Sequence, residues 1–220
     1  MGLNVPTDSS TLSMWLQAVI ETNQVQDCVL KLMLTGGESE DGMTPISCNI
    51  IVMASELKRP NPAVYKQGVK LVTMEHLRES PTAKHFNYSS AASQIQHMTA
   101  QGGYELLYHH QGLVSEASRS NIFIVKDGVL RTPRTDILLG IARQNVLQLA
   151  KERQLPMQEA PITMGMCLSA QEVFITGSSK RIVPVVQIDN TQIGLGRVGQ
   201  ITQSLMQYYQ VLIDAQLNKS

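Results

Sequence analysis

Four features of this 220-residue chain have the residue types and the order needed for chemistry at an amine. Lys84 carries a primary amine that can condense with a carbonyl group and later carry a proton. Glu116 follows it and can keep a nitrogen base protonated. Two loops come next, Gly140-Ile141-Ala142 and Gly177-Ser178-Ser179, and each can offer backbone N–H groups to an anion. Together these features indicate a site for a phosphorylated carbonyl compound.

Lys84 is the candidate nucleophile, although most lysines are solvated surface charges. Its neighbours Phe86, Tyr88, Ala91 and Ala92 are apolar, and we expect them to enclose the amine. Burial disfavours the charged form of an ammonium group and lowers its pKa. The sequence therefore predicts an apolar setting in which the pKa of Lys84 is lowered.

The two loops are candidates for binding the anion. The first opens the clearest helix of the chain, predicted over 141–153, where free N–H groups and the helix dipole favour negative charge. The second follows a predicted strand over 172–176, and Ser178 is its expected hydroxyl donor. Arg143 and Glu172 are expected to form structural ion pairs. Glu116 can also be interpreted as an ordinary acid at the end of a strand.

The elements that must position these residues are many short strands and few helices, which predicts an α+β fold. A Pro-rich linker at Lys58–Pro62 separates two predicted domains, residues 1–60 and residues 61–220. Asp127-Gly128 predicts a tight hairpin turn. The predicted helices begin near Thr7–Ser10 and cover 89–100, 141–153 and 199–215. The predicted strands cover 27–35, 46–54, 69–73, 104–109, 121–126, 129–132, 172–176 and 183–188.

Composition excludes several classes of function. The net charge is zero, so nucleic acid is not an expected partner. The three cysteines have no zinc or disulfide spacing, which favours a reduced, cytoplasmic setting. The histidines share no metal spacing, and His109-His110 is expected at the surface. No long apolar run or leader pattern occurs, so no membrane association is expected.

The order of these motifs resembles the class IV aminotransferase family, which includes branched-chain and D-amino acid aminotransferases and aminodeoxychorismate lyase. Lys84–Tyr88 is similar to the family's lysine segment, and Ser118–Phe123 is similar to its Ser-x-x-Asn-Ile/Leu-Phe signature. Ala117 and Ala142 stand where the family usually has Gly and Thr. The resemblance runs from about Val5 to Tyr209.

The resemblance implies a two-domain pyridoxal phosphate enzyme of fold type IV whose small N-terminal domain is shortened. It implies pyridoxal 5'-phosphate bound covalently to Lys84, with Glu116 on its ring nitrogen. Its phosphate would lie at Gly140, Ile141, Ala142, Gly177, Ser178 and Ser179. It also implies a homodimer in which the loop Gly36–Met43 closes the partner's site. That loop lacks the arginine that D-amino acid aminotransferases use for the substrate carboxylate.

Two reactions stay open at this point. Transamination would move the amino group of an amino acid or related amine to a keto acid, and lyase chemistry would convert aminodeoxychorismate to 4-aminobenzoate and pyruvate. Both need the same residues, so the sequence separates them poorly. A third interpretation is a protein that binds the cofactor with weak or no turnover.

Overall fold

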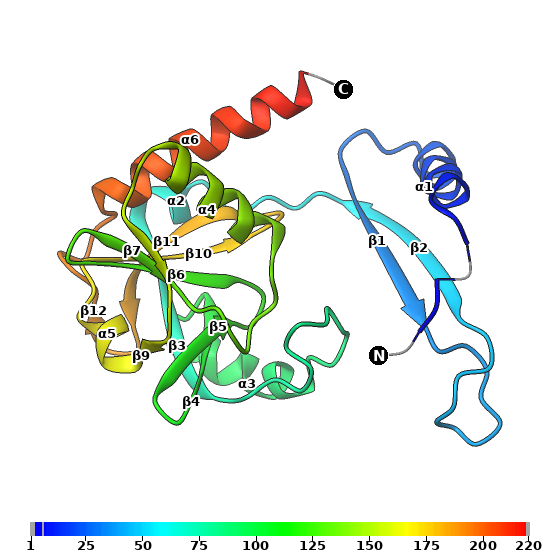
Figure 1. Cartoon of the computed structure of the whole chain (residues 1–220), viewed down its shortest axis with the longest axis horizontal. Coiled ribbons are helices and arrows are strands. Elements are labelled where there is room, and N and C mark those ends of the chain that lie inside the picture. The colour runs from blue at the N-terminus through cyan, green and yellow to red at the C-terminus, as the bar shows by residue number, and fades with distance from the viewer. Residues whose placement is uncertain (1–2, 6, 219–220) are drawn as a thin grey trace. The chain divides into compact units, whose positions relative to one another are not determined.

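The computed structural model describes residues 3–5 and 7–218. The chain divides into two compact units, Met1–Arg59 and Pro60–Ser220. Figure 1 colours the first unit blue to cyan and the second cyan to red. The Pro-rich segment after Leu57 forms no helix or strand until α2 begins at Ala63, because proline removes a backbone donor and restricts its neighbour.

The first unit consists of one helix and one hairpin. Helix α1 (Ser9–Asn23) begins after Asp8, whose carboxylate accepts the N–H groups of Ser10 and Thr11. Strand β1 (Cys28–Thr35) pairs antiparallel with β2 (Asn49–Glu56). The second strand begins three residues later than the sequence predicted, since 46–48 form an irregular segment.

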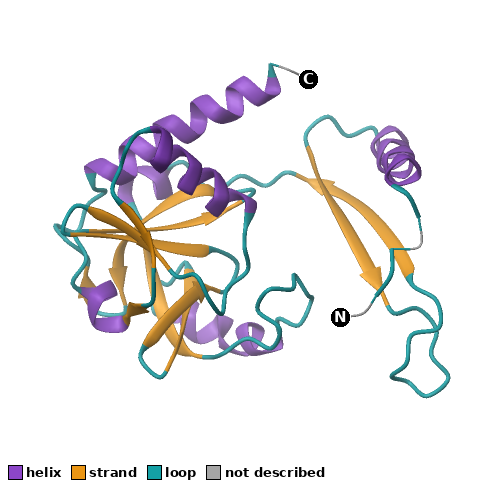
Figure 2. Cartoon of the chain, viewed as in Figure 1, coloured by secondary structure: helices purple, strands orange, loops and turns teal. Residues whose placement is uncertain are grey.

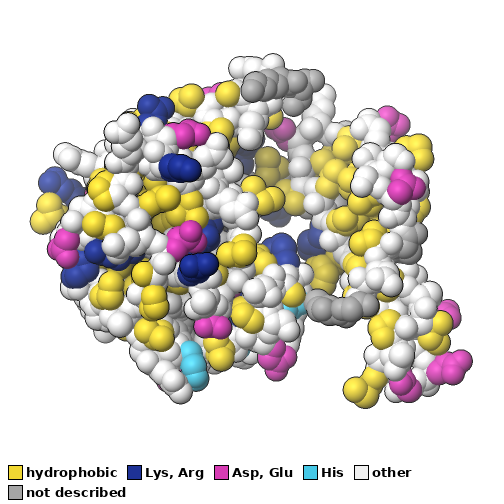
Figure 3. All heavy atoms as spheres, viewed as in Figure 1, with side chains coloured by type: hydrophobic (Ala, Val, Ile, Leu, Met, Phe, Trp, Pro, Cys, Tyr) yellow, Lys and Arg dark blue, Asp and Glu magenta, His cyan; other side chains and the backbone are white. Residues whose placement is uncertain are grey.

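No described residue of the first unit is buried. Apolar side chains of both strands are instead exposed, and Figure 3 shows hydrophobic side chains at its surface. The exposed strand residues are Val29, Leu32, Ile51 and Met53. A hairpin with a single helix offers too little surface to enclose them.

The second unit is built on a ten-stranded mixed sheet, shown in orange in Figure 2. Its strand order is β8-β7-β6-β10-β11-β3-β4-β5-β9, with β12 paired to β11. The strands are β3 (Val69–Glu75), β4 (Glu105–His110), β5 (Leu113–Ala117), β6 (Asn121–Lys126), β7 (Val129–Thr132), β8 (Met157–Glu159), β9 (Ile162–Thr163), β10 (Glu172–Gly177), β11 (Arg181–Ile188) and β12 (Thr191–Gln192). The helices are α2 (Ala63–Gln67), α3 (Ser89–Ala100), α4 (Ile141–Glu152), α5 (Met164–Leu168) and α6 (Gln200–Leu217).

Strand β6 lies between two apolar clusters. Alternate side chains of a strand point to opposite faces, so Ile122 and Ile124 join one cluster while Phe123 joins the other. Phe123 stacks on Phe174 of β10 with ring centroids 4.9 Å apart, and α4 and α6 contribute to the same cluster. This packing fixes the ends of β5, β6 and β10, where the candidate site residues lie.

The predicted α+β class is confirmed, with several boundaries and short elements corrected. The sequence did not predict β5, β8, β9 and β12 or the five-residue helices α2 and α5. The hairpin turn between β6 and β7 has Asp127 at φ 53° and Gly128 at φ 73°, the left-handed pair of a type I′ turn. Among the described residues, no helix is long and apolar enough to cross a bilayer.

Candidate active site

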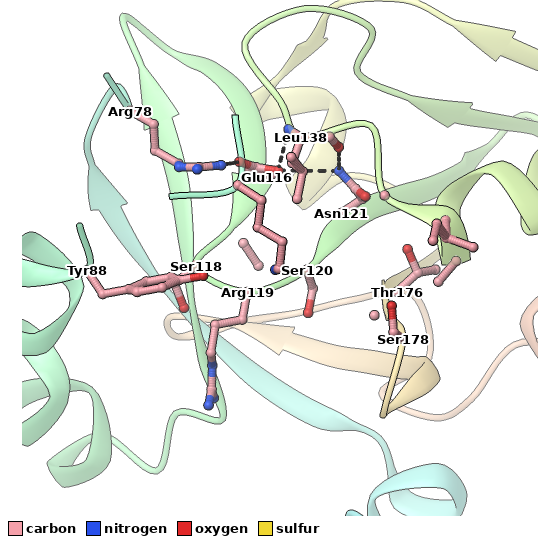
Figure 4. Close-up of a pocket in the computed structure, with 16 residues that line it drawn as sticks. Arg78, Tyr88, Glu116, Ser118, Arg119, Ser120, Asn121, Leu138, Thr176 and Ser178 are labelled. Atoms are coloured by element: carbon pink, nitrogen blue, oxygen red, sulfur yellow. Dashed lines mark hydrogen bonds and ion pairs between the residues drawn. The ribbon is translucent and has the colours of Figure 1, made fainter. Parts of the chain in front are cut away.

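The candidate site is a pocket of about 560 Å³, counted with its open mouth, in the second unit. Its walls are the loop before α3, the end of β5, the start of β6, the start of α4 and the end of β10 (Figure 4). Seven predicted site residues line it, namely Lys84, Glu116, Gly140, Ile141, Ala142, Gly177 and Ser178. Ser179 does not line it. Segments far apart in the sequence thus meet in one cavity.

Lys84 lies in an irregular loop between β3 and α3 and is exposed. The predicted apolar enclosure is wrong for this unit, since Phe86 is 55% and Tyr88 is 40% exposed. Only Ala91 of the four apolar neighbours is buried, because the loop and the start of α3 hold the others at the surface. Lys84 therefore presents its amine at an open wall of the pocket.

Glu116 lies near the end of β5 and is 3% exposed. Its Oε1 accepts from Arg78 Nη1 at 2.5 Å, and its Oε2 accepts from the backbone N–H of Leu138 at 3.0 Å and from Asn121 Nδ2 at 3.3 Å (Figure 4). Burial raises the pKa of this carboxyl above its usual value, while the Leu138 N–H and Arg78 oppose that rise.

The hydrogen bonds of Glu116 leave room for a further donor. An ionised carboxylate has about four acceptor positions, and three described donors occupy Oε1 once and Oε2 twice. One position on Oε1 remains. A buried carboxylate with a free acceptor position can hold a protonated nitrogen that enters the pocket.

The start of α4 forms one end of the pocket. Gly140 is its N-cap in an extended conformation, and no side chain caps the helix. A Cβ at Gly140 would lie 2.5 Å from Asn121 Oδ1, so the Asn121 side chain would have to shift to admit any other residue. Ile141 and Ala142, the first residues of this twelve-residue helix, line the pocket, and the free N–H groups of a helix start favour an anion.

Thr176 at the end of β10 was not predicted as a site residue. It is 1% exposed and lines the pocket, yet its hydroxyl has no hydrogen-bond partner among the described residues. A buried hydroxyl without a partner costs free energy, so it indicates a group that the pocket binds. Period-two alternation with the buried Phe174 could have identified it from the sequence.

Arg78 was also missed, as were Tyr88, Ser118, Arg119, Ser120, Asn121 and Leu138 as pocket residues. Arg78 meets Glu116 only through the fold, and its residue type alone gives no signal.

The predicted ion pair of Arg143 is confirmed, since Arg143 Nη2 lies 2.6 Å from Glu159 Oε2.

The predicted ion pair of Glu172 is wrong. Its carboxylate accepts from the backbone N–H groups of Ile201 and Thr202 and from the Thr202 hydroxyl, so it caps the start of α6.

The prediction that His109 and His110 lie at the surface holds in part. His110 is exposed, whereas His109 is half-buried and its Nδ1 is buried without a partner among the described residues.

The pocket combines groups that suit one kind of ligand. It has an amine at Lys84, a buried acceptor at Glu116 and an anion-binding helix start at Gly140. These groups can bind a nitrogen heterocycle with an anionic arm and a carbonyl carbon that reaches the amine.

Comparison with known proteins gives the family. The model of the amino-transferase class IV family matches residues 1–188. The chain is 34% identical over 206 residues to a Methanocaldococcus jannaschii protein provisionally named branched-chain-amino-acid aminotransferase, covering 88% of this chain and 71% of that protein. It is 31% identical over 218 residues to a Listeria monocytogenes D-alanine aminotransferase, covering 95% of this chain and 75% of that protein.

The structure agrees with these matches. The branched-chain amino acid aminotransferase from T.th., solved with pyridoxamine 5'-phosphate, superposes with a TM-score of 0.84 at 27% identity, covering 94% of this chain and 72% of that one. The chain spans only 40% of two Arabidopsis thaliana branched-chain-amino-acid aminotransferase-like proteins. The chain belongs to the class IV aminotransferases.

Proposed function

We propose that the chain is a pyridoxal phosphate-dependent aminotransferase that acts on amino acids. The observation that carries the proposal is the meeting of Lys84, Glu116, Ser178 and the start of α4 in one pocket. Relatives named as branched-chain and D-alanine aminotransferases support transamination. A structure titled 4-amino-4-deoxychorismate lyase is only 23% identical, so its likeness supports the fold alone.

The residues present fit pyridoxal phosphate. Glu116 keeps one acceptor position for the ring nitrogen, and the buried Thr176 hydroxyl, which has no hydrogen-bond partner among the described residues, can bind a polar group of the ligand. Lys84 would hold the cofactor covalently. Its phosphate would be held by Gly140, Ile141 and Ala142 on one side, and by Gly177 and Ser178 on the other.

When bound, the cofactor supplies an electron sink for breaking a bond at the substrate's α-carbon. The chain's own residues supply orientation and proton transfer. Glu116, whose charged form the Leu138 N–H and Arg78 favour, would hold the ring nitrogen in its protonated form. The amine of Lys84 would take the proton from the substrate's α-carbon and deliver it to a second carbon.

Arg119 is the candidate for binding the carboxylate of a substrate, although its guanidinium points away from Glu116 in Figure 4. Arg78 is engaged by Glu116, whereas the guanidinium of Arg119 has no carboxylate partner among the described side chains. An arginine can bind a carboxylate with two parallel hydrogen bonds. Amino acids are therefore favoured over simple amines.

We also propose a homodimer in which the loop Gly36–Met43 reaches the partner's site. Symmetric dimers are the commonest oligomers. The open wall at Lys84 supports this proposal, because proton transfer by the Lys84 amine benefits from exclusion of water.

The test is a spectral titration followed by an activity panel. Protein with pyridoxal phosphate should develop visible absorbance and turn over branched-chain L-amino acids or D-alanine with 2-oxoglutarate. Release of pyruvate from aminodeoxychorismate without amino transfer would identify the lyase instead. Cofactor binding without turnover of any donor would identify a binding protein, the alternative that the sequence left open.

A further inference from the structure

A buried ion pair contacts two residues that line the pocket. Glu105 begins β4 and is fully buried, and its Oε2 lies 2.5 Å from Lys180 Nζ. Lys180 is 9% exposed. Placing two charges out of water is costly and adds little stability by itself. Neither residue lines the pocket, so the pair can affect the pocket only through the residues to which it is hydrogen-bonded.

Glu105 connects two turns that do line the pocket. Its Oε1 accepts the backbone N–H of Arg119, and its Oε2 accepts the Ser120 hydroxyl at 3.0 Å. Both belong to the turn between β5 and β6. Lys180 ends the turn between β10 and β11 that contains Ser178. One carboxylate thus links the two turns through hydrogen bonds and an ion pair.

The two turns also lie beside each other. A Cβ at Gly177 would make an ordinary contact with the carbonyl oxygen of Arg119, at 3.5 Å. Tyr65 donates its hydroxyl to the carbonyl of Lys180 at 3.0 Å, which anchors that turn from α2. Movement of either turn would therefore shift Gly177 and the hydroxyl of Ser178.

We propose that Glu105 is a positioning residue that holds Ser118–Ser120 and Gly177–Lys180 in the geometry required for cofactor binding. This inference rests on the proposed function. Lys180 neutralises the buried carboxylate, and the carboxylate supplies the acceptors that the first turn lacks. A purely stabilising ion pair could be replaced by apolar side chains without loss, whereas a positioning carboxylate could not.

Two double variants separate these roles. Glu105→Met with Lys180→Met removes both charges and every acceptor, while Glu105→Gln with Lys180→Met removes the charges but keeps a carbonyl acceptor for the Arg119 N–H. Each is measured for thermal unfolding, for pyridoxal phosphate affinity by absorbance titration, and for hydrogen–deuterium exchange of the peptide that contains Arg119.

The apolar pair should unfold within about 5 °C of the parent, exchange faster at Arg119 and bind the cofactor about tenfold or more weakly. The Glu105→Gln pair should bind within about threefold of the parent. Unchanged affinity and exchange in the apolar pair would overturn the proposal. If the apolar pair does not fold, the Glu105→Gln pair alone decides. A loss of cofactor affinity of about tenfold or more in that folded variant would overturn the proposal.

Asp189→Asn is the matched control. Asp189 accepts the backbone N–H and hydroxyl of Thr73 at 2.8 and 2.7 Å, and neither residue lines the pocket. This variant should lower the unfolding temperature without changing cofactor affinity. A parent protein that binds no cofactor would refute the proposed function, yet the exchange experiment would still test whether Glu105 holds the turn.

Discussion

Arg78 Nη1 lies 2.5 Å from Glu116 Oε1, although the two residues lie on separate segments before and after α3. The side chains are 14% and 4% exposed, so little water screens the pair. Burial raises the pKa of the Glu116 carboxyl, and the Leu138 N–H and the Arg78 guanidinium both oppose this effect. The ionisation of Glu116 thus depends on a residue outside the sequence motifs.

Replacing Arg78 should change the pH dependence of turnover. In Arg78→Met, the cation that lowers the pKa of Glu116 is lost, so the carboxyl becomes protonated at a higher pH than in the parent. The acid limb of the kcat/KM profile should then move to higher pH by about one unit or more. A profile that keeps its acid limb would show that Arg78 does not control this group.

Replacing Glu116 should affect turnover more than binding. Glu116→Gln keeps the size of the side chain but cannot hold a ring nitrogen in its protonated form. The cofactor should stay bound while kcat falls by about a thousandfold, or about 4 kcal/mol of barrier. Near-normal kcat would place the acid elsewhere in the chain.

Lys84 should carry the cofactor. Borohydride reduction of the protein with pyridoxal phosphate should attach the cofactor's mass permanently to the peptide that contains Lys84. Lys84→Ala should lose turnover and labelling, yet should unfold at nearly the parent temperature because the side chain is exposed. A label on another lysine, such as the buried Lys180, would contradict the assignment.

Gly140→Ala should weaken cofactor binding. The new methyl group would lie 2.5 Å from Asn121 Oδ1, and Asn121 is held by Glu116 and by the carbonyl of Leu138. We expect affinity to fall about tenfold as the start of α4 shifts. Gly165→Ala is the control, because its nearest neighbour would be 3.9 Å away. Equal affinity in both variants would exclude a close approach at Gly140.

Much of this site could be predicted because its residues mark local structure. Gly140 precedes a helix with clear periodicity, and Gly177 follows an apolar strand, so both loops could be placed by pattern alone. Lys84 and Glu116 could be ordered along the chain by their motifs. Elements with strong local signals, such as α4 and β6, were predicted within a few residues.

The remaining features depend on contacts between distant segments. Arg78 and Glu105 act through partners that the sheet brings close, and no local pattern shows such pairs. The exposure of Phe86 could not be predicted either, because an apolar residue indicates burial only if some element covers it. Glu172 was misassigned because a carboxylate can cap a helix as well as pair with a cation.

The acidic loop Gly36–Met43 provides the last prediction, which concerns the proposed homodimer. Asp41 accepts the backbone N–H groups of Met43 and Thr44, and these hydrogen bonds hold the pKa of its carboxyl well below the usual range. Asp41→Arg would therefore disrupt the loop itself. Glu40 is exposed and is the better site for reversing charge.

If the loop faces the partner's site, Glu40→Arg should increase kcat/KM for a dicarboxylate donor such as D-glutamate by about fivefold, since repulsion becomes attraction. The value for D-alanine should change less, and the gain should shrink at high salt. Light scattering should first give the mass of a dimer. An active monomer would contradict the shared site. An unchanged ratio of kcat/KM for D-glutamate to kcat/KM for D-alanine would show that the loop lies away from the substrate.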